Sequence, residues 1–222
     1  MRLKNREEAA KQLAKALSPY HRDHPLVLGI PRGGVPMARV IADALDGDVD
    51  VVLVRKLRAP GQPELAIGAI DESGTVLKGE YFGMAPDEHI RQEIRTQQEI
   101  LRTRRQLYTR ARPSIQPAGR IVIIVDDGVA TGSSMISAIR SVRAQGARRI
   151  VVALGVAPHQ SLRRLALEAD EVVCLLSPEW FHAVGEFFEE FGEVTDDMVV
   201  AALTPPKGTL REHATTEVNS AQ

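Results

Sequence analysis

The sequence predicts an α/β protein whose mostly parallel sheet is covered by helices on both faces. Two observations predict it. Short apolar runs that do not alternate with polar residues are typical of strands buried on both faces. Helical patterns separate successive runs, which is the order that a parallel sheet requires. The runs lie at 26–30, 49–54, 121–125, 149–156 and 171–176.

The N-terminal half contains clear start and stop signals. Asn5 is a suitable helix cap, and Ala9, Leu13 and Leu17 recur behind it at helical spacing. Charge, Pro and Gly between 55 and 62 predict a loop. The elements expected in order are a helix at 5–17, a strand at 26–30, a helix at 35–45, a strand at 49–54, the loop at 55–62, and a hairpin of strands at 65–70 and 75–77.

In the second half, Pro86 and Pro113 bound a long polar helix at 87–111. The other expected elements are helices at 134–144 and 161–167, strands at 149–156 and 171–176, and a partly helical segment at 179–203. We expect residues 1–204 to form a single domain, with an inserted hairpin and helix at about 64–113. The tail at 205–222 lacks apolar content, which predicts disorder.

Composition excludes several classes of protein. The 222 residues carry a net charge of −1, so nothing in the global charge favours nucleic acid or an acidic membrane as partner. The single cysteine, Cys174, excludes an internal disulfide, and its apolar surroundings predict a buried thiol rather than a nucleophile. The first twenty residues lack the apolar core of a signal peptide, and no apolar run approaches the ~20 residues that span a bilayer. We expect a cytoplasmic protein.

The most informative segment is 121–134, in which an apolar strand runs directly into Asp126 and Asp127. Ligands of open α/β sheets bind at this end of a strand. The hydroxyls and backbone N–H groups that follow at a helix N-terminus suit a phosphate. The carboxylates suit hydroxyl donors or a hydrated Mg²⁺. A ribose 5-phosphate fits both halves. The phosphate-binding candidates are Ala130, Thr131, Gly132, Ser133 and Ser134.

This segment has two other interpretations. A buried strand can simply end in a solvated acidic turn, with Ser or Thr capping the next helix. A Walker nucleotide site is disfavoured, because the glycine spacing differs and no Lys follows the glycine.

A second segment, at 28–34, places two glycines after a strand. Gly33 and Gly34 let the backbone approach a ligand closely and turn its N–H groups inward. Arg32 adds a forked donor that suits phosphate oxygens. A Gly-rich turn with a solvated Arg is the alternative.

The 121–134 segment resembles the phosphoribosyl pyrophosphate (PRPP) motif of type I phosphoribosyltransferases: an apolar run, an acidic pair, then Thr-Gly and further hydroxyls. The resemblance implies that family's fold, a parallel five-stranded core sheet flanked by helices with a small hood, here at about 178–203, and an inserted helical flap. It implies that Asp126 and Asp127 hold the ribose hydroxyls and that 130–134 wrap the 5′-phosphate.

The resemblance also implies a pyrophosphate site. Arg32, Gly33 and Gly34 stand where the family has its pyrophosphate loop, and a cis peptide bond is expected at or next to Arg32. Arg55 and Lys56 correspond to the family's basic flexible loop. Asp126, Asp127 and Arg32 are then the catalytic candidates. Mg²⁺ is the implied cofactor, bound mainly through PRPP, with Asp126 and Asp127 as candidate ligands.

The acceptor is not identified by the sequence. Trp180 and Phe181 follow the last core strand and could stack on a flat acceptor such as a nucleobase, or could form a small core under the hood. Family members acting on 6-oxopurines carry an acid where this chain has Ala130. The order of motifs resembles bacterial phosphoribosyltransferases of unassigned acceptor, so a nitrogenous acceptor is all that is implied.

The helix at 87–111 is strongly basic: seven Arg and two Glu lie between Arg91 and Arg112. A solvated surface is the simplest account. A flap that guides PRPP inward and a surface that binds RNA are the two other accounts of this helix.

The motifs together make a PRPP-dependent transferase the leading hypothesis. The alternative is a PRPP-sensing regulator with little catalysis that binds nucleic acid or a protein. Dimers are frequent in the family, which makes a homodimer an expectation.

Overall fold

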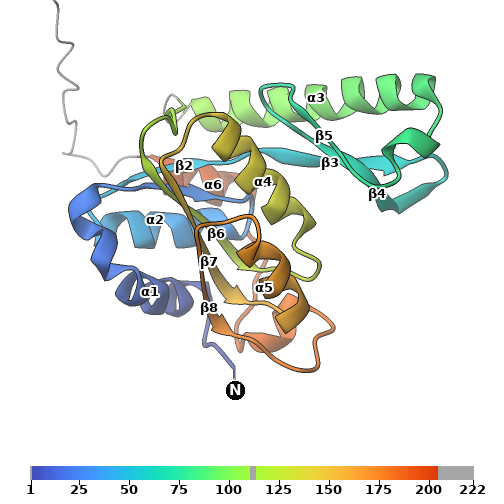
Figure 1. The fold of residues 1–222 in the computed structure, drawn as a ribbon. Helices are drawn as coiled ribbons and strands as arrows, with labels where there is room; N and C mark the ends of the chain where they lie inside the picture. The colour runs from blue at the N-terminus through green and yellow to red at the C-terminus, as the bar shows by residue number, and fades with distance from the viewer. Residues whose placement is uncertain (1, 111–113, 205–222) are drawn as a thin grey trace, which may run out of the picture.

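The computed structural model describes residues 2–110 and 114–204. The tail predicted to be disordered lies outside them. The core is a five-stranded parallel sheet in the order β2-β1-β6-β7-β8 (Figure 1). Its strands are β1 (Leu26–Gly29), β2 (Asp48–Val51), β6 (Ile121–Gly128), β7 (Arg149–Val156) and β8 (Glu171–Leu176). The predicted α/β class is therefore confirmed, and β7 and β8 have the expected bounds.

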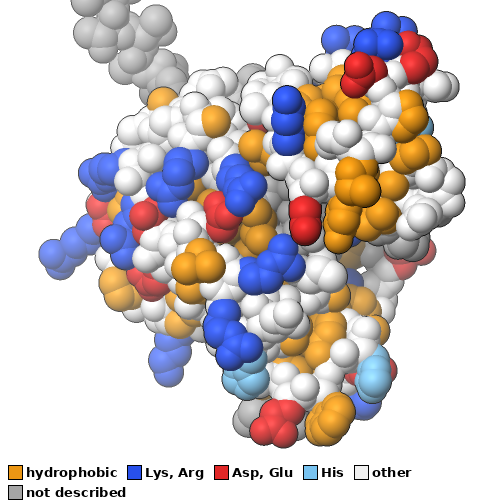
Figure 2. Space-filling model, turned by 45° about the vertical axis from the view of Figure 1, so that its right-hand side comes forward, with side chains coloured by type: hydrophobic (Ala, Val, Ile, Leu, Met, Phe, Trp, Pro, Cys, Tyr) orange, Lys and Arg blue, Asp and Glu red, His pale blue; other side chains and the backbone are white. Residues whose placement is uncertain are grey.

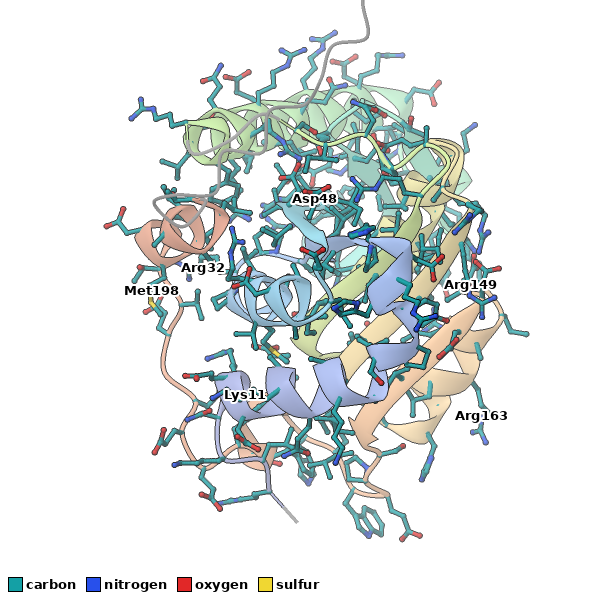
Figure 3. The ribbon with its side chains drawn as sticks, turned by 90° about the vertical axis from the view of Figure 1, so that its left-hand side faces the viewer. Lys11, Arg32, Asp48, Arg149, Arg163 and Met198 are labelled. Carbon is teal, nitrogen blue, oxygen red and sulfur yellow. The ribbon has the colours of Figure 1, made fainter. Side chains whose placement is uncertain are left out.

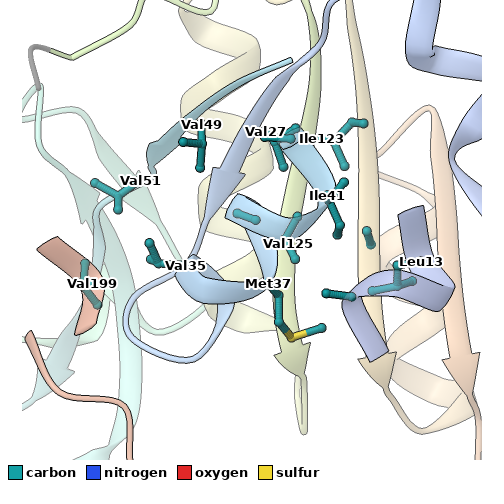
Figure 4. Close-up of a cluster of buried hydrophobic side chains, with 14 of the residues drawn as sticks. Leu13, Val27, Val35, Met37, Ile41, Val49, Val51, Ile123, Val125 and Val199 are labelled. Atoms are coloured by element: carbon teal, nitrogen blue, oxygen red, sulfur yellow. The ribbon is translucent and has the colours of Figure 1, made fainter. Parts of the chain in front are cut away.

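Helices cover both faces of this sheet. Residues of α1 (Arg6–Ala16) and α2 (Gly34–Ala44) pack with Ile123 and Val125 of β6 in one apolar layer (Figure 4). Residues of α4 (Ser133–Ala144) and α5 (His159–Ala166) pack with Val122 and Ile124 in the other. Side chains along a strand alternate between faces, so successive β6 residues belong to different layers. This alternation decides where the acidic pair at the end of β6 points.

The strand order brings the two predicted loops together. β1 lies between β2 and β6, with Gly29 opposite both Val51 and Val125. The segments that follow β1 and β6 therefore leave the sheet side by side at its carboxyl edge.

A second, antiparallel sheet contains β3 (Val54–Ala59), β4 (Gln62–Asp71) and β5 (Val76–Lys78). The predicted β4–β5 hairpin is confirmed. The predicted loop at 55–62 is wrong, because most of it is β3 and the start of β4. The turn between them contains Pro60 and Gly61, and Gly61 has φ +70°. Pro followed by a glycine of positive φ is the signature of a tight type II turn rather than of an open loop.

The helix α3 (Asp87–Thr109) packs on β3 and β4 and is fixed near its C-terminal end. The hydroxyl of Tyr108 donates to Oδ1 of Asp196 at 2.9 Å, at the start of α6 (Asp196–Leu203). Nη1 of Arg105 donates to Oδ1 of the buried Asp50 at 3.2 Å, and Arg105 also pairs with Glu72. This end of α3 is thus bound to both sheets and to α6.

The N-terminal segment meets the segment after β8 beyond the carboxyl edge of the core sheet. Leu3 forms a parallel bridge with Phe188, its N–H donates to the Phe187 carbonyl at 2.8 Å, and its carbonyl accepts from Glu189 at 2.9 Å. Short 3₁₀ helices complete the fold: η1 (Ser18–Asp23), η2 (Phe82–Met84) and η3 (Val184–Phe187). Among the described helices, none combines the length and apolar character needed to cross a bilayer.

Candidate active site

The segment after β1 touches the end of β6 through its backbone. The N–H of Ile30 donates to the Val125 carbonyl at 2.9 Å. A Cβ on Gly34 would lie 2.3 Å from that same carbonyl oxygen, so only glycine fits this approach. The peptide bond between Pro31 and Arg32 is cis, at the position expected from the sequence.

The acidic pair is divided between the two faces of the sheet. Asp127 continues the series of Ile123 and Val125 toward α1 and α2, and Asp126 continues the series that packs against α4. Oδ1 of Asp126 accepts a hydrogen bond from the backbone N–H of Asp127 at 2.9 Å. The two carboxylates therefore approach a ligand at the strand end from different sides.

Asp127 is buried and has a cationic partner. Nε of Arg6 donates to Oδ2 of Asp127 at 2.8 Å. A Cβ on Gly33 would lie 2.1 Å from this oxygen, so the glycine makes room for the carboxylate. Burial raises the pKa of Asp127, while the hydrogen bond and charge of Arg6 act in the opposite direction.

Asp126 has no ion pair among the described residues. Loss of hydration, followed by the negative charge of Asp127, raises the pKa of Asp126 well above its usual range. A carboxylate in such a position favours groups that supply hydroxyl donors or a cation. Carboxylate oxygens suit Mg²⁺. In the described ranges no cluster of three or more His, Cys, Asp or Glu could hold a metal, so the donors that fit Mg²⁺ here are the two aspartates.

The hydroxyl-rich turn at 130–134, called the cradle below, leads from β6 into α4. Gly132 has φ +75° immediately before the helix, and Oγ1 of Thr131 lies 3.1 Å from Oγ of Ser133. Two side chains of α5 hold this turn from behind. Oγ of Ser161 donates to the Ala130 carbonyl at 2.6 Å, and Nη1 of Arg164 donates to the Thr131 carbonyl at 3.0 Å. The carbonyls point toward α5, which leaves the N–H groups at the start of α4 to face an anion.

A basic cavity of about 300 Å³ lies next to this cradle. It contains the predicted residues Arg55 and Lys56 together with Ser134 of the cradle and Pro31 of the β1 segment. Nε of Arg55 donates to Oε1 of Gln97 at 2.8 Å. Burial, followed by the charges of Arg104 and Arg58, lowers the pKa of Arg55. The remaining lining residues are Ile30, Val54, Arg58 and Arg104.

Arg32 takes a different direction from Arg55 and Lys56. Its side chain is exposed, and Nη2 donates to Oε1 of Glu193 at 2.8 Å, just before α6 (Figure 3). The backbone of 31–34 borders the site, while the Arg32 guanidinium binds the C-terminal segment.

The two aromatic candidates, Trp180 and Phe181, have different surroundings. Trp180 is 82% exposed. The ring of Phe181 stacks on Phe187 with centroids 5.4 Å apart, and it packs against the core, as the alternative of a small hood core predicts. On the face in Figure 2, Lys and Arg side chains are spread among carboxylates rather than gathered into one patch.

Sequence reasoning missed Arg6 and did not single out Arg104. Nothing near Arg6 in the sequence connects it with Asp127, because the contact depends on the tertiary fold. For Arg104 a signal existed: it lies three residues after Leu101 and four before Tyr108, and both of these are buried. That spacing puts Arg104 on the inward stripe of the helix.

Comparison with known proteins identifies the family of this chain. Residues 2–189 match the family described as "Phosphoribosyl transferase domain". Two Mycobacterium tuberculosis proteins, "Putative phosphoribosyl transferase MT0597" and "Putative phosphoribosyl transferase Rv0571c", are each 42% identical over 205 residues, 90% of this chain and 46% of their own length. The chain thus spans about half the length of these curated relatives. The crystal structure of TT1426 from Thermus thermophilus is 46% identical, with a TM-score of 0.83 over 91% of this chain and 98% of that one. The chain belongs to the phosphoribosyl transferase domain family.

Proposed function

We propose that this chain transfers the 5-phosphoribosyl group of PRPP to a nitrogenous acceptor and releases pyrophosphate. The observation that carries the proposal is that three features meet at the carboxyl edge of the core sheet. An anion cradle opens α4, the two aspartates end β6, and a cavity lined by four cationic side chains lies beside them. PRPP carries one group for each of them: a 5′-phosphate, ribose hydroxyls and a pyrophosphate.

In this proposal the N–H and hydroxyl groups at 130–134 bind the 5′-phosphate. Asp126 and Asp127 accept hydrogen bonds from the ribose hydroxyls. Arg55 and Lys56, with the backbone of 32–34, bind the pyrophosphate. Arg32 would contribute its side chain only after exchanging Glu193 for the ligand.

The bond from C1 of the ribose to the pyrophosphate oxygen breaks, and its electron pair leaves with the pyrophosphate. The lone pair of the acceptor nitrogen forms the new bond to C1. Positive charge develops on the ribose and negative charge on the leaving group, so the cations of the cavity stabilise the transition state electrostatically. Mg²⁺, when bound, supplies further charge neutralisation at the pyrophosphate. No nucleophilic side chain is needed.

The acceptor end is proposed more coarsely. Ala130 supplies no acid beside the cradle, which favours acceptors other than 6-oxopurines. Trp180 is the exposed aromatic available for stacking on a flat ring, and Phe181 borders it from the small hood core.

The test is to incubate the protein with PRPP, Mg²⁺ and a panel of nitrogenous bases and to follow pyrophosphate release. We expect acceptor-dependent release. Calorimetry with PRPP tests the site: Asp126→Asn combined with Asp127→Asn should abolish binding, while Asp197→Asn, at an exposed position of α6, should not. Unchanged affinity in the double variant would refute the ribose assignment. Tight binding without turnover on any base would instead favour the PRPP-sensing alternative.

A further inference from the structure

We propose that the inserted helix α3 is part of the pyrophosphate site and that Arg104 is its ligand-binding residue. The inference rests on the proposed function and extends it, since it gives the basic helix a role that the sequence left open. It also sets Arg104 apart from the other arginines of α3.

Arg104 lies on the face of α3 that packs against the protein, not on the face that meets solvent. Leu101, Arg104, Arg105 and Tyr108 follow the spacing i, i+3, i+4, i+7, which defines one face of a helix. Leu101 and Tyr108 are buried, and Arg105 is held by Asp50 and Glu72. Arg104 shares this inward face, yet among the described residues it forms no hydrogen bond or ion pair. A half-buried guanidinium without a partner is costly unless an anion completes it.

The surroundings of Arg104 point to a polyvalent anion. Four cationic side chains line the cavity, from β3 and from α3: Arg55, Lys56, Arg58 and Arg104. None of the four is paired with a carboxylate among residues 2–110 and 114–204. Within those ranges, the only side-chain hydrogen bond from the four is that of Arg55 to the neutral Gln97. Mutually repelling cations in one cavity are stabilised by a ligand that carries several negative charges.

The cavity also has the correct neighbours for a pyrophosphate. Pro31 and Ile30 on one wall belong to the segment after β1, and Ser134 on another belongs to the cradle proposed for the 5′-phosphate. An anion in this cavity therefore lies between the two loops, where the leaving group of PRPP must be.

The helix backbone at Arg104 is fixed before any ligand arrives. Its neighbour Arg105 is bound to Asp50 and Glu72, and Tyr108, one turn later, is bound to Asp196. Binding therefore has to order the Arg104 side chain but not the helix that carries it, which keeps the entropic cost of the contact low. By contrast, Arg102 is exposed on the outer surface of the helix, where its Nη1 lies 3.9 Å from Oε2 of Glu99.

The experiment is calorimetry of the full chain with inorganic pyrophosphate in Mg²⁺ buffer, repeated with ribose 5-phosphate. We expect Arg104→Ala to weaken pyrophosphate binding about 10- to 100-fold, the usual effect of losing one charge-assisted hydrogen bond. Binding of ribose 5-phosphate should not change. Arg104→Lys, which keeps the charge and loses the fork, should fall between. Arg102→Ala is the matched control and should bind both ligands like the parent.

Thermal unfolding separates this role from a structural one. Arg104→Ala removes an unpaired charge and should not lower Tm, whereas Arg105→Ala leaves the buried Asp50 without its cation and should lower it. A parent chain that binds pyrophosphate, together with an Arg104→Ala variant of equal affinity, would overturn the role of α3 alone. A parent chain that binds neither pyrophosphate nor PRPP would overturn the proposed function itself.

Discussion

Arg6 and Asp127 are 121 residues apart in sequence, and Nε of the one donates to Oδ2 of the other at 2.8 Å. The Arg6 guanidinium also donates to the Gly192 carbonyl at 2.7 Å and lies 3.8 Å from the centroid of the Phe191 ring. The carboxylate proposed to hold the ribose is thus connected, through the Arg6 side chain, with the segment at 191–192 that follows β8. Arg6 favours the charged form of Asp127 at a position where burial disfavours it.

Arg6→Ala should therefore change the pH dependence of PRPP binding. Without the guanidinium, burial dominates and the pKa of Asp127 rises further. We expect affinity to be lost at low pH and to recover only at higher pH than in the parent. Calorimetry with PRPP between pH 5.5 and 8.5 measures this. Arg6→Lys should restore much of the profile, and Lys11→Ala, on the exposed side of the same helix, should match the parent. If PRPP affinity in Arg6→Ala depended on pH in the same way as in the parent, the role given to Arg6 and Asp127 would be contradicted.

Asp126→Asn should make the protein more stable at pH 7 while it removes a ribose ligand. The pKa of Asp126 is raised in the folded state, so the parent loses stability as the pH rises from the unfolded pKa, near ~4, through the folded value. Asn carries no charge and avoids this loss, which amounts to about 1.4 kcal/mol for each pH unit that separates the folded pKa from the unfolded one.

Thermal unfolding from pH 3 to pH 8 checks the Asp126 prediction. The difference in Tm between Asp126→Asn and the parent should shrink toward zero near pH 3, where the Asp126 carboxyl of the parent is protonated in both the folded and the unfolded state. Asp127→Asn is the control, because it deprives Arg6 of its partner and should not stabilise. A lower Tm for Asp126→Asn at pH 7 would show that burial does not dominate at this carboxyl.

Gly33→Ala should impair PRPP binding through Asp127 rather than through the loop backbone. Gly33 has φ −60°, a conformation open to any residue, so the constraint is space: the added Cβ would lie 2.1 Å from Oδ2 of Asp127. The carboxylate must shift, and we expect PRPP affinity to fall at least about tenfold, as for loss of one charge-assisted hydrogen bond. Gly83→Ala meets nothing within 4 Å and is the matched control. Equal affinities for the two variants would count against the assignment.

Cys174 should react slowly with thiol reagents in the folded protein. Burial raises the pKa of this thiol to about 11, from an ordinary value of 9.0. A rise of this size corresponds to about a hundredfold less thiolate at neutral pH. Ellman's reagent at pH 7.5 should label the native protein slowly and the guanidinium-unfolded protein rapidly. Rapid labelling of native protein would contradict the expected buried thiol.

The sequence predicts the core of this fold well because its signals are local. The apolar runs at 149–156 and 171–176 have the bounds of β7 and β8, since strands buried on both faces need no alternation. The strand β3 was missed for the opposite reason. Only Leu57 in Val54–Ala59 is buried, and three cations occupy the rest of its centre. Strand formation there depends on pairing with β4, which a local pattern does not contain.

The site divides in the same way. The cradle at 130–134 and the pair Asp126 and Asp127 are contiguous, so a short motif predicts them. That the two carboxylates lie on opposite faces follows from the strand period, but the partner of each depends on which helix covers that face. Arg6 enters only because α1 packs beside α2, and Arg104 only because α3 is held against both sheets.

The bridge between Leu3 and Phe188 has a consequence for the nascent chain. The segment around Leu3 cannot take its final place until residues 187–189 have been translated, because its hydrogen bonds are made with Phe187 and Glu189. Until then the sheet and the cradle can form, but the hydrogen bond from Arg6 to Asp127 is not yet fixed in place. The carboxylate proposed to hold the ribose therefore gains its cationic partner only after residues 188–192 have been translated, long after the strand that carries it.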